Sequence, residues 1–501
     1  MNNTILQHII YSSKFIIPEI MLTCGIIGLI LLNIISKAKK HCPYTIITVV
    51  TLITALITTI PMLFMPEHSI YFNMLLIDKF SIFFRILFII SSIFLTLISI
   101  NTKELENNNL LEYYVLIISM LIGMNLLASA NNLLMIYLSL EMISIPSYIL
   151  TGYLKNKRFS LEASLKYIIY GAMSSAIMLY SFTYIYGFTN TLTLNEIKQA
   201  ILSSNIPSQF LLFFIILTMV GIGFKLSLVP FHFWTPDVYQ GAPTPISAHL
   251  SIASKAAAFA LLLRIFLSSL ATPSLNNIIT IGAPWINLIA ILSVITMTLG
   301  NVIALVQKDI KRLLAYSTIA HAGYMIMGLV ALNNDGVSAI LFYLIAYLIM
   351  NLGSFYTAIL LYPSVGSYNI GDYKGLWNRN SAATIAMAFF MLSLVGIPPF
   401  IGFFAKFILF AAIINAGWFW LAVVAVINSV VSLYYYVYII KVMVIDTAQQ
   451  TKPILIPKIA YSLVIILAIL NLIFGPAFKP FQQFAKNSTS ICNVNSYCIQ
   501  K

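Results

Sequence analysis

Long apolar runs fill most of the chain and decide what it can fold into. Residues 422–440, for example, are predominantly apolar on every side of a helix and long enough to cross a bilayer. Hydrophobic residues make up 60% of the sequence and charged residues only 8%, which is far from the composition of a soluble domain. We therefore predict an all-α polytopic membrane protein.

A window of about 19 residues, moved along the sequence, finds about fourteen membrane-spanning helices. We place them near 15–36, 43–64, 77–100, 111–129, 131–153, 162–186, 209–232, 243–269, 284–306, 311–332, 336–362, 381–411, 417–445 and 455–475. The loops between them are short, so a soluble catalytic domain is not expected.

Basic residues are distributed unevenly between the loops, and they account for the formal net charge of +13 better than nucleic-acid binding does. Lys37, Lys155 and Lys308 belong to basic loops on one face, whereas the opposite loops carry little beyond Lys79 and Lys198. By the positive-inside rule, both termini are expected in the periplasm of a bacterium. No cleavable signal peptide is expected, and a bacterial inner membrane is favoured over a mitochondrial one.

Four ionisable residues lie inside predicted spans: Glu141, Lys225, Lys255 and Lys406. Each ionisable group at a bilayer centre costs roughly 2.5–3.5 kcal/mol, so the four together cost about 10 kcal/mol. A passive membrane scaffold is disfavoured by that cost. The pattern indicates that charge moves through the membrane beside these residues.

Two similar segments interrupt predicted spans: LSLVPF at 226–231 and LSLVGIPPF at 392–400. Proline inside a helix removes a backbone hydrogen bond, so each segment predicts a discontinuous helix. Lys225 precedes the first break and Lys406 follows the second, the order that an inverted repeat requires. Broken helices with ionisable neighbours predict a transport site near the membrane midplane.

A buried lysine beside a carboxylate can hold or release a proton when its partner moves, which makes Glu141 and Lys225 a candidate gate. His321 is our preferred proton relay between the lysines. For His232, a relay and a packing role are equally open. For His249, we favour packing in which the ring donates to a helix carbonyl.

The remaining charged residues of the spans are expected to have structural roles. Arg264, Lys79 and Lys441 should reach the membrane surface with their long side chains. Arg85 and Asp309 are expected to stabilise the fold.

The cysteines and sequence motifs give no reason to expect a redox centre. Cys24 and Cys42 do not form a metal-binding pair, and no dinucleotide fingerprint or P-loop is present. Cys492 and Cys498 form either a disulfide or, as we favour, two free thiols.

Several stretches carry the motifs of a known family, and together they extend from residue 110 to residue 445. They are FKLSLVPFHFWTPDVY from 224 to 239, GAPTP from 241 to 245, Glu141-Met142 with Pro146, Ser254-Lys255-Ala256, KRLLAYS from 311 to 317 with His321 and Gly323-Tyr324, and GIPP from 396 to 399 with Gly402-Phe403 and Lys406. The chain thereby resembles the antiporter-like subunits of respiratory complex I, and most closely the NADH-quinone oxidoreductase subunit N family.

That resemblance implies fourteen helices with two inverted five-helix repeats, each containing a broken helix. Here the repeats would occupy 111–269 and 270–445, with N-terminal helices in 1–110 and a final helix and tail in 446–501.

It also implies roles for individual residues. Glu141 and Lys225 would form the gated pair of one half-channel, Lys255 would bridge, and Lys406 would serve the other half-channel. Lysine at position 406 separates the chain from a similar sister subunit that carries glutamate there.

The function implied is proton translocation driven by electron transfer from NADH to quinone in other subunits. NADH, FMN, iron–sulfur clusters and quinone are expected in those partners, and no cofactor is expected in this chain. The expected partners are antiporter-like neighbours, small membrane subunits, lipid and protons, and no nucleic acid. The alternative is a subunit of a cation/proton antiporter or membrane-bound hydrogenase-type complex.

Overall fold

The computed structural model describes residues 2–36, 41–105, 109–203, 207–273, 278–280, 284–447, 452–454 and 456–489. Cys492 and Cys498 lie outside these residues, so the prediction about them stays open. Cys24 and Cys42 are both free and exposed.

Helices make up nearly all of the described chain. In the first half they are α1 (Asn2–Ser13), α2 (Ile17–Ser36), α3 (His41–Thr59), α4 (Lys79–Ser99), α5 (Leu110–Ser129), α6 (Leu133–Thr151), α7 (Arg158–Thr189), α8 (Leu194–Ser203), α9 (Ser208–Leu226), α10 (Trp234–Gly241), α11 (Thr244–His249) and α12 (Lys255–Ile265). In the second half they are α13 (Pro284–Ala304), α14 (Ile310–Val330), α15 (Asn334–Val365), α16 (Leu376–Arg379), α17 (Ser381–Val395), α18 (Ile401–Asn415), α19 (Phe419–Val444), α20 (Lys458–Ile473) and α21 (Phe478–Asn487).

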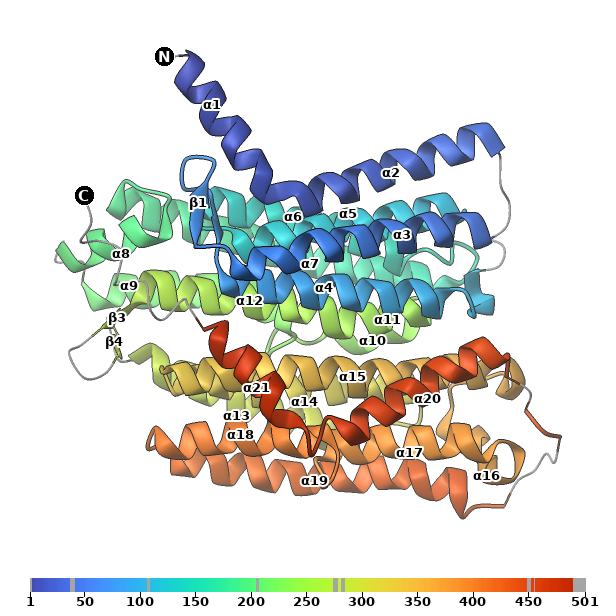
Figure 1. Cartoon of the computed structure of the whole chain (residues 1–501). Coiled ribbons are helices and arrows are strands. Elements are labelled where there is room, and N and C mark those ends of the chain that lie inside the picture. Colours follow the sequence, from blue (N-terminus) through green and yellow to red (C-terminus); the bar gives the residue numbers. More distant parts are fainter. Residues whose placement is uncertain are drawn as a thin grey trace.

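Two short antiparallel hairpins accompany the helices. The first pairs β1 (His68–Ile70) with β2 (Leu75–Ile77), and the second pairs β3 (Ala271–Pro273) with β4 (Ile278–Thr280). Figure 1 shows both hairpins and α8 at one end of the helix bundle and α16 at the other. Helix α1 begins, and α21 ends, toward the end that carries the hairpins. The two described ends of the chain therefore lie toward the same end of the bundle.

The described residues contain 12 helices that are long and apolar enough to cross a membrane, or 13 if α20 and α21 count as one bent span. Two shorter apolar helices, α17 and α18, occupy the region where we predicted a broken span. The prediction of an all-α polytopic membrane protein is confirmed. The sequence did not reveal α21, which follows the predicted last span, 455–475, and is bent by 83° from α20.

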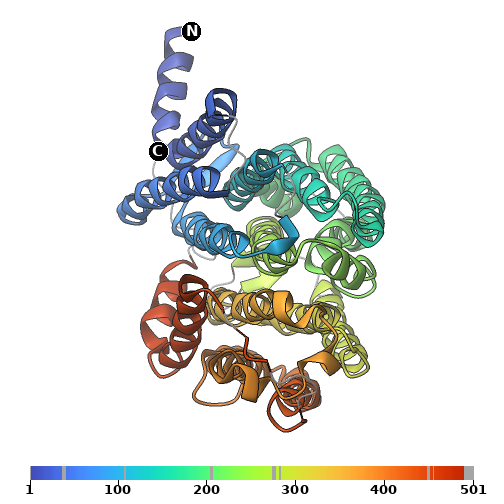
Figure 2. The same cartoon turned by 90° about the vertical axis from the view of Figure 1, so that its right-hand side faces the viewer.

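The two halves of the chain form adjoining groups of helices, seen end on in Figure 2. The spans Thr244–Leu270, Ile310–Val330 and Asn334–Val365 are almost wholly buried inside the protein. By contrast, most of Ile9–Ile35 and Phe419–Val444 is exposed. The central spans are therefore enclosed by the outer helices of the chain.

Both predicted breaks are present, and their backbones end the preceding helix in the same way. At the end of α9, Ser227 is left-handed and the amide of Leu228 donates to the carbonyl of Gly223 at 2.8 Å. At the end of α17, Gly396 is left-handed, and the amide of Ile397 donates to the carbonyl of Leu392 at 3.2 Å. These are matching Schellman-type endings, and each is followed by proline, which cannot continue the hydrogen-bonded helix.

Arg264 does not reach the membrane surface, so that prediction was wrong. Its guanidinium is buried and binds Asp78 at 2.7 Å and 3.0 Å, and it also donates to the carbonyl of Ala128 at 2.7 Å. Asp78 also caps α4 through the amide of Ser81, at 2.8 Å. A buried carboxylate supplies a much better partner for arginine than a reach to the surface through apolar helices.

The two charges that we expected to be structural have structural partners. Arg85 is buried and lies 3.1 Å from a carboxylate oxygen of Glu19, a residue that the sequence did not single out. Asp309 caps α14 by accepting from the amide of Arg312 at 3.0 Å. Lys79 and Lys441 are exposed, as expected.

Candidate functional site

Lys225 lies two residues before the first break, and its ammonium group is enclosed by aromatic rings. The side chain is buried, and the nitrogen has no hydrogen-bond partner in the described structure. It lies 5.7 Å from the ring centres of both Tyr148 and Tyr167, and 5.8 Å from that of Phe224. Ring faces attract a cation, but they accept no proton.

Glu141 lies on α6, near enough to Lys225 for the two charges to interact electrostatically. No ion pair joins them, and one carboxylate oxygen of Glu141 is buried without a hydrogen-bond partner in the described structure. Tyr148 lies two helical turns after Glu141 and interacts with its charge as well. Tyr148 therefore lies near both members of the predicted pair, which form no ion pair with each other in the described structure.

Lys255 follows a π-helical segment, Leu250–Ser254, in the wholly buried span that begins with α11. Its ammonium group donates to the backbone carbonyl of Thr318 at 3.1 Å. Ser254 interacts with the hydroxyl of Tyr167, one of the rings around Lys225. Lys255 thus lies between the surroundings of Lys225 and helix α14 of the second half.

Three residues spaced by three along α14 continue the polar line: Thr318, His321 and Tyr324. Residues at this spacing share one face of a helix. The ring of Tyr324 lies 4.9 Å from the ammonium group of Lys406, and 5.9 Å from the ring of His321. One face of α14 therefore runs from Lys255 to Lys406.

His321 is the best-connected of the candidate histidines. One ring nitrogen lies 2.7 Å from the hydroxyl of Tyr343, and the other lies 3.2 Å from the hydroxyl of Tyr436. Tyr436 is hydrogen-bonded in turn to Ser317. His321 also interacts electrostatically with both Lys406 and Lys255. With a hydroxyl on each ring nitrogen, this histidine can accept a proton on one side and donate one on the other.

Lys406 lies on α18 and reaches back to the second break. Its ammonium group donates to the carbonyl of Val395 at 2.7 Å and to the hydroxyl of Ser429 at 2.8 Å. The Val395 carbonyl is free to accept because α17 ends there. Gly402 allows the close approach, since a Cβ there would overlap the carbonyl oxygen of Ser393.

The other two histidines are not linked to this line by any hydrogen bond in the described structure. His232 lies in the first break, with its Nδ1 atom buried and unpartnered. His249 is buried at the end of α11, and neither ring nitrogen has a partner. Our expectation that His249 donates to a helix carbonyl was wrong, because neither ring nitrogen has a hydrogen-bond partner among the described residues.

Asp237 on α10 joins three helices at the edge of the site. Its carboxylate binds Lys166 of α7 at 2.6 Å and Arg312 of α14 at 2.8 Å. A small cavity of about 120 Å³ opens beside these side chains. The ion pairs tie the first half of the chain to the second next to the first break.

A second cluster of polar residues joins the loop before α5 to the loop after α15. Glu104 accepts from the amide of Thr244 at 2.8 Å and from the hydroxyl of Tyr368 at 3.3 Å. Burial raises the pKa of Tyr368 well above its ordinary value, so its phenol stays protonated. Lys311, near the start of α14, is buried here and donates to the carbonyl of Ala242 at 2.7 Å.

No cluster of three or more His, Cys, Asp or Glu side chains that could hold a metal ion occurs among the described residues. The groups that surround the lysines are hydroxyls, carbonyls and aromatic rings. Such groups relay protons and stabilise cations, and they are not a ligand set for a transition metal.

The sequence identified the charged residues of the site and missed the hydroxyls around them. Tyr148, Tyr167 and Tyr436 stood among many tyrosines, and Ser429 stood inside an apolar run. The spacing of Thr318, His321 and Tyr324 was the one pattern from which part of the line could have been found.

Comparison with known proteins identifies the group to which this arrangement belongs. Residues 130–432 match the family model described as "NADH:quinone oxidoreductase/Mrp antiporter, TM". NADH-quinone oxidoreductase subunit N 2 of Chloroherpeton thalassium is 41% identical over 482 residues, which cover 95% of this chain and 94% of that protein. NADH-quinone oxidoreductase subunit N of Chlorobium chlorochromatii is 40% identical over 493 residues, covering 96% and 95% respectively.

A solved structure agrees with these relatives. A chain of respiratory complex I from Thermus thermophilus with bound aureothin has a TM-score of 0.78 and 30% identity, covering 94% of this chain and 100% of that chain. The resemblance noted in the sequence is confirmed. The chain belongs to the NADH:quinone oxidoreductase/Mrp antiporter family, among its NADH-quinone oxidoreductase subunit N members.

Proposed function

We propose that the chain is a proton-translocating membrane-arm subunit of respiratory NADH:quinone oxidoreductase. The observation that carries this function is the polar line from Glu141 to Lys406, in which Glu141 is half-buried and the three lysines are buried. This line passes through the central spans, which are almost wholly buried inside the protein. Three buried lysines and a half-buried glutamate are too costly for a passive scaffold. The relatives, which are named as subunits of this oxidoreductase, support the same assignment.

In the proposed path, Glu141 and Lys225 form the gate of the first half-channel. Lys255 and His321 bridge the two halves, and Lys406 serves the second half-channel. The hydrogen bonds of His321 to two tyrosines and its electrostatic contact with two lysines support the bridging role. His232 is a candidate for proton entry, because it lies in the first break.

We further propose two inverted repeats, at 111–269 and 270–445. The matching helix endings at Leu228 and Ile397 support them, and so does the opposite position of the lysine relative to each break. The segments 1–110 and 446–501 would flank this core.

The rest of the assembly follows from the same assignment. NADH, FMN, iron–sulfur clusters and quinone would be held by partner subunits, and this chain would contact antiporter-like neighbours and small membrane subunits. The bacterial relatives favour a bacterial inner membrane. Periplasmic termini would place the basic loops in the cytoplasm.

A cation/proton antiporter complex is the second candidate, because the matching family model also covers Mrp antiporters. The two relatives described above are instead named as NADH-quinone oxidoreductase subunits, over nearly their full length. We therefore assign the chain to the oxidoreductase.

The test is NADH-driven proton pumping in membrane vesicles that carry Lys225→Ala, with quinone reduction and complex assembly measured in the same vesicles. Lys441→Ala is the control, because Lys441 is exposed at the end of α19. We expect an assembled complex that loses both pumping and coupled quinone reduction, while the control keeps both. Retention of both activities by Lys225→Ala would show that Lys225 is structural and would refute the proposed path.

A further inference from the structure

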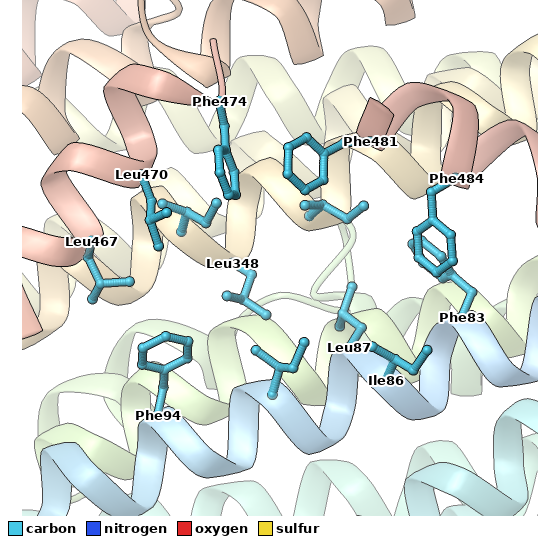
Figure 3. Close-up of a pocket in the computed structure, with 13 residues that line it drawn as sticks. Phe83, Ile86, Leu87, Phe94, Leu348, Leu467, Leu470, Phe474, Phe481 and Phe484 are labelled. Carbon is cyan, nitrogen blue, oxygen red and sulfur yellow. The ribbon is translucent and has the colours of Figure 1, made fainter. Parts of the chain in front are cut away.

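A groove lined only by apolar side chains lies at the seam between the two halves, away from the polar line. It has a volume of about 240 Å³. Helices α4 and α15 line one side of the groove, and the bent pair α20 and α21 lines the other, as Figure 3 shows. Phe83, Phe94, Leu348, Phe474 and Phe484 point into the shared space.

The groove lies within the hydrocarbon depth of the membrane and opens to the protein surface. The side lined by α4 and α15 belongs to two spans, Lys79–Ser99 and Asn334–Val365. Several lining side chains, including Ile86, Phe94 and Phe481, are partly exposed. Water has no polar group to bind there, so the natural occupant is hydrocarbon.

Positive charge gathers at one end of this groove. Phe83 of α4 and Phe484 of α21 meet there, with ring centres 5.4 Å apart. Lys79 stands one helical turn before Phe83, and Lys486 stands two residues after Phe484; both are exposed. This end belongs to the face where the sequence places few basic residues, so the two lysines are not explained by the positive-inside rule.

The neighbouring charges leave these lysines available to a ligand. Lys486 lies 3.5 Å from Asp335, but both side chains are exposed, and such surface pairs contribute little stability. Asp78, next to Lys79, is buried and already bound to Arg264. The mouth of the groove is therefore net positive.

We propose that this groove binds an anionic phospholipid, with one acyl chain between α4, α15, α20 and α21, and the phosphate at Lys79 and Lys486. The acyl chain fills the apolar space at the seam of the two halves. The headgroup charge is attracted by the lysines, each of which contributes about as much as a basic residue at an anionic membrane surface. The site is independent of the proton path.

The experiment uses the whole complex in nanodiscs, with a phosphatidylglycerol that carries a diazirine on one acyl chain. After irradiation, peptide mass spectrometry locates the labelled residues. We expect labelling concentrated on α4, α15, α20 and α21, and roughly fivefold stronger than with the same chain on phosphatidylcholine. Labelling spread evenly over all exposed helices would overturn the proposal.

Variants separate the chain site from the headgroup site. Leu348→Trp should fill the groove and remove its labelling, whereas Ile427→Trp, on the exposed face of α19, should leave it unchanged. Lys79→Gln with Lys486→Gln should keep the labelling but abolish the preference for phosphatidylglycerol. Asp335→Asn keeps Lys486 and removes its partner, so it should retain that preference.

Two results would contradict the assignment of the ligand. One is an unchanged preference for phosphatidylglycerol in the double lysine variant. The other is labelling of the same peptides by an azido-quinone with an isoprenoid tail that excess phosphatidylglycerol does not displace. Neither result depends on whether the complex pumps protons, so this site and the proposed function can fail separately.

Discussion

The lysines beside the two helix breaks have opposite surroundings, although the backbones of the breaks match. Lys225 in the first half has no hydrogen-bond partner among the described residues and faces aromatic rings, and it interacts with Glu141 without forming an ion pair. Lys406 in the second half donates to a freed carbonyl, that of Val395, and to the hydroxyl of Ser429. One lysine is left without an acceptor, and the other has two.

Two helix breaks with the same backbone geometry can therefore serve two functions, because their lysines have different partners. A cation without acceptors depends on the nearest opposite charge, so Lys225 should respond when Glu141 changes its charge or position. A cation with two fixed acceptors is held in place by neutral groups. We infer that the first half senses the charge of Glu141 and gates the proton path. The second half holds its lysine in place and transfers the proton.

The largest effect should come from removing the charge of Glu141. Glu141→Gln leaves the shape nearly unchanged, but it removes the one carboxylate that interacts with Lys225. We expect pumping to fall by about 10²-fold or more, the loss typical when a proton-transfer group is removed. NADH-driven pumping measures it, and Glu141→Asp, which keeps the charge, should retain more activity than Glu141→Gln. Equal losses in both variants would mean that charge is not what Glu141 supplies.

The second prediction compares how rigid the two breaks are. A Cβ at Gly402 would meet the backbone carbonyl of Ser393, whereas a Cβ at Gly223 would meet only the movable ring of Phe231. Gly402→Ala should therefore cost about 1–3 kcal/mol, the range typical of overpacking. Gly223→Ala should cost less. Thermal unfolding of the assembled complex measures both, and a larger loss for Gly223→Ala would contradict the comparison.

A smaller effect is expected from Ser429→Ala. It removes one acceptor of Lys406 and leaves the carbonyl of Val395 in place. Hydrogen bonds to charged groups contribute about 1.5–3 kcal/mol, and since one acceptor remains we expect only a roughly threefold to tenfold loss of pumping. Ser432→Ala is the matched control, because that hydroxyl donates to the carbonyl of Ser429 on its own helix. If both variants behave alike, Ser429 does not hold the lysine.

Much of the fold and the charged part of the site could be predicted from the sequence. Apolar runs locate spans because the bilayer leaves no other regular structure for them, and the prolines after Ser227 and Gly396 locate the breaks. The buried charges stood out because so few charges are present.

The rest could not be predicted because it depends on which helices become neighbours. Arg264 was misjudged since its partner, Asp78, lies 186 residues away in sequence. Helix α21 is too polar for a span search and is positioned by Phe481 and Phe484 on the groove between the halves. The approach of Tyr148 to Lys225 could not be predicted without the packing of α6 against its neighbours.

The central claim is that both halves form one connected proton path. The most direct test measures NADH-driven proton pumping in assembled complexes that carry Lys225→Ala, Lys406→Ala or both. A single path predicts that each single variant loses nearly all pumping and that the double variant is no worse, since effects within one unit are strongly non-additive. Two independent routes would leave each single variant with roughly half of the pumping, and only the double variant would lose it all; that result would contradict our account.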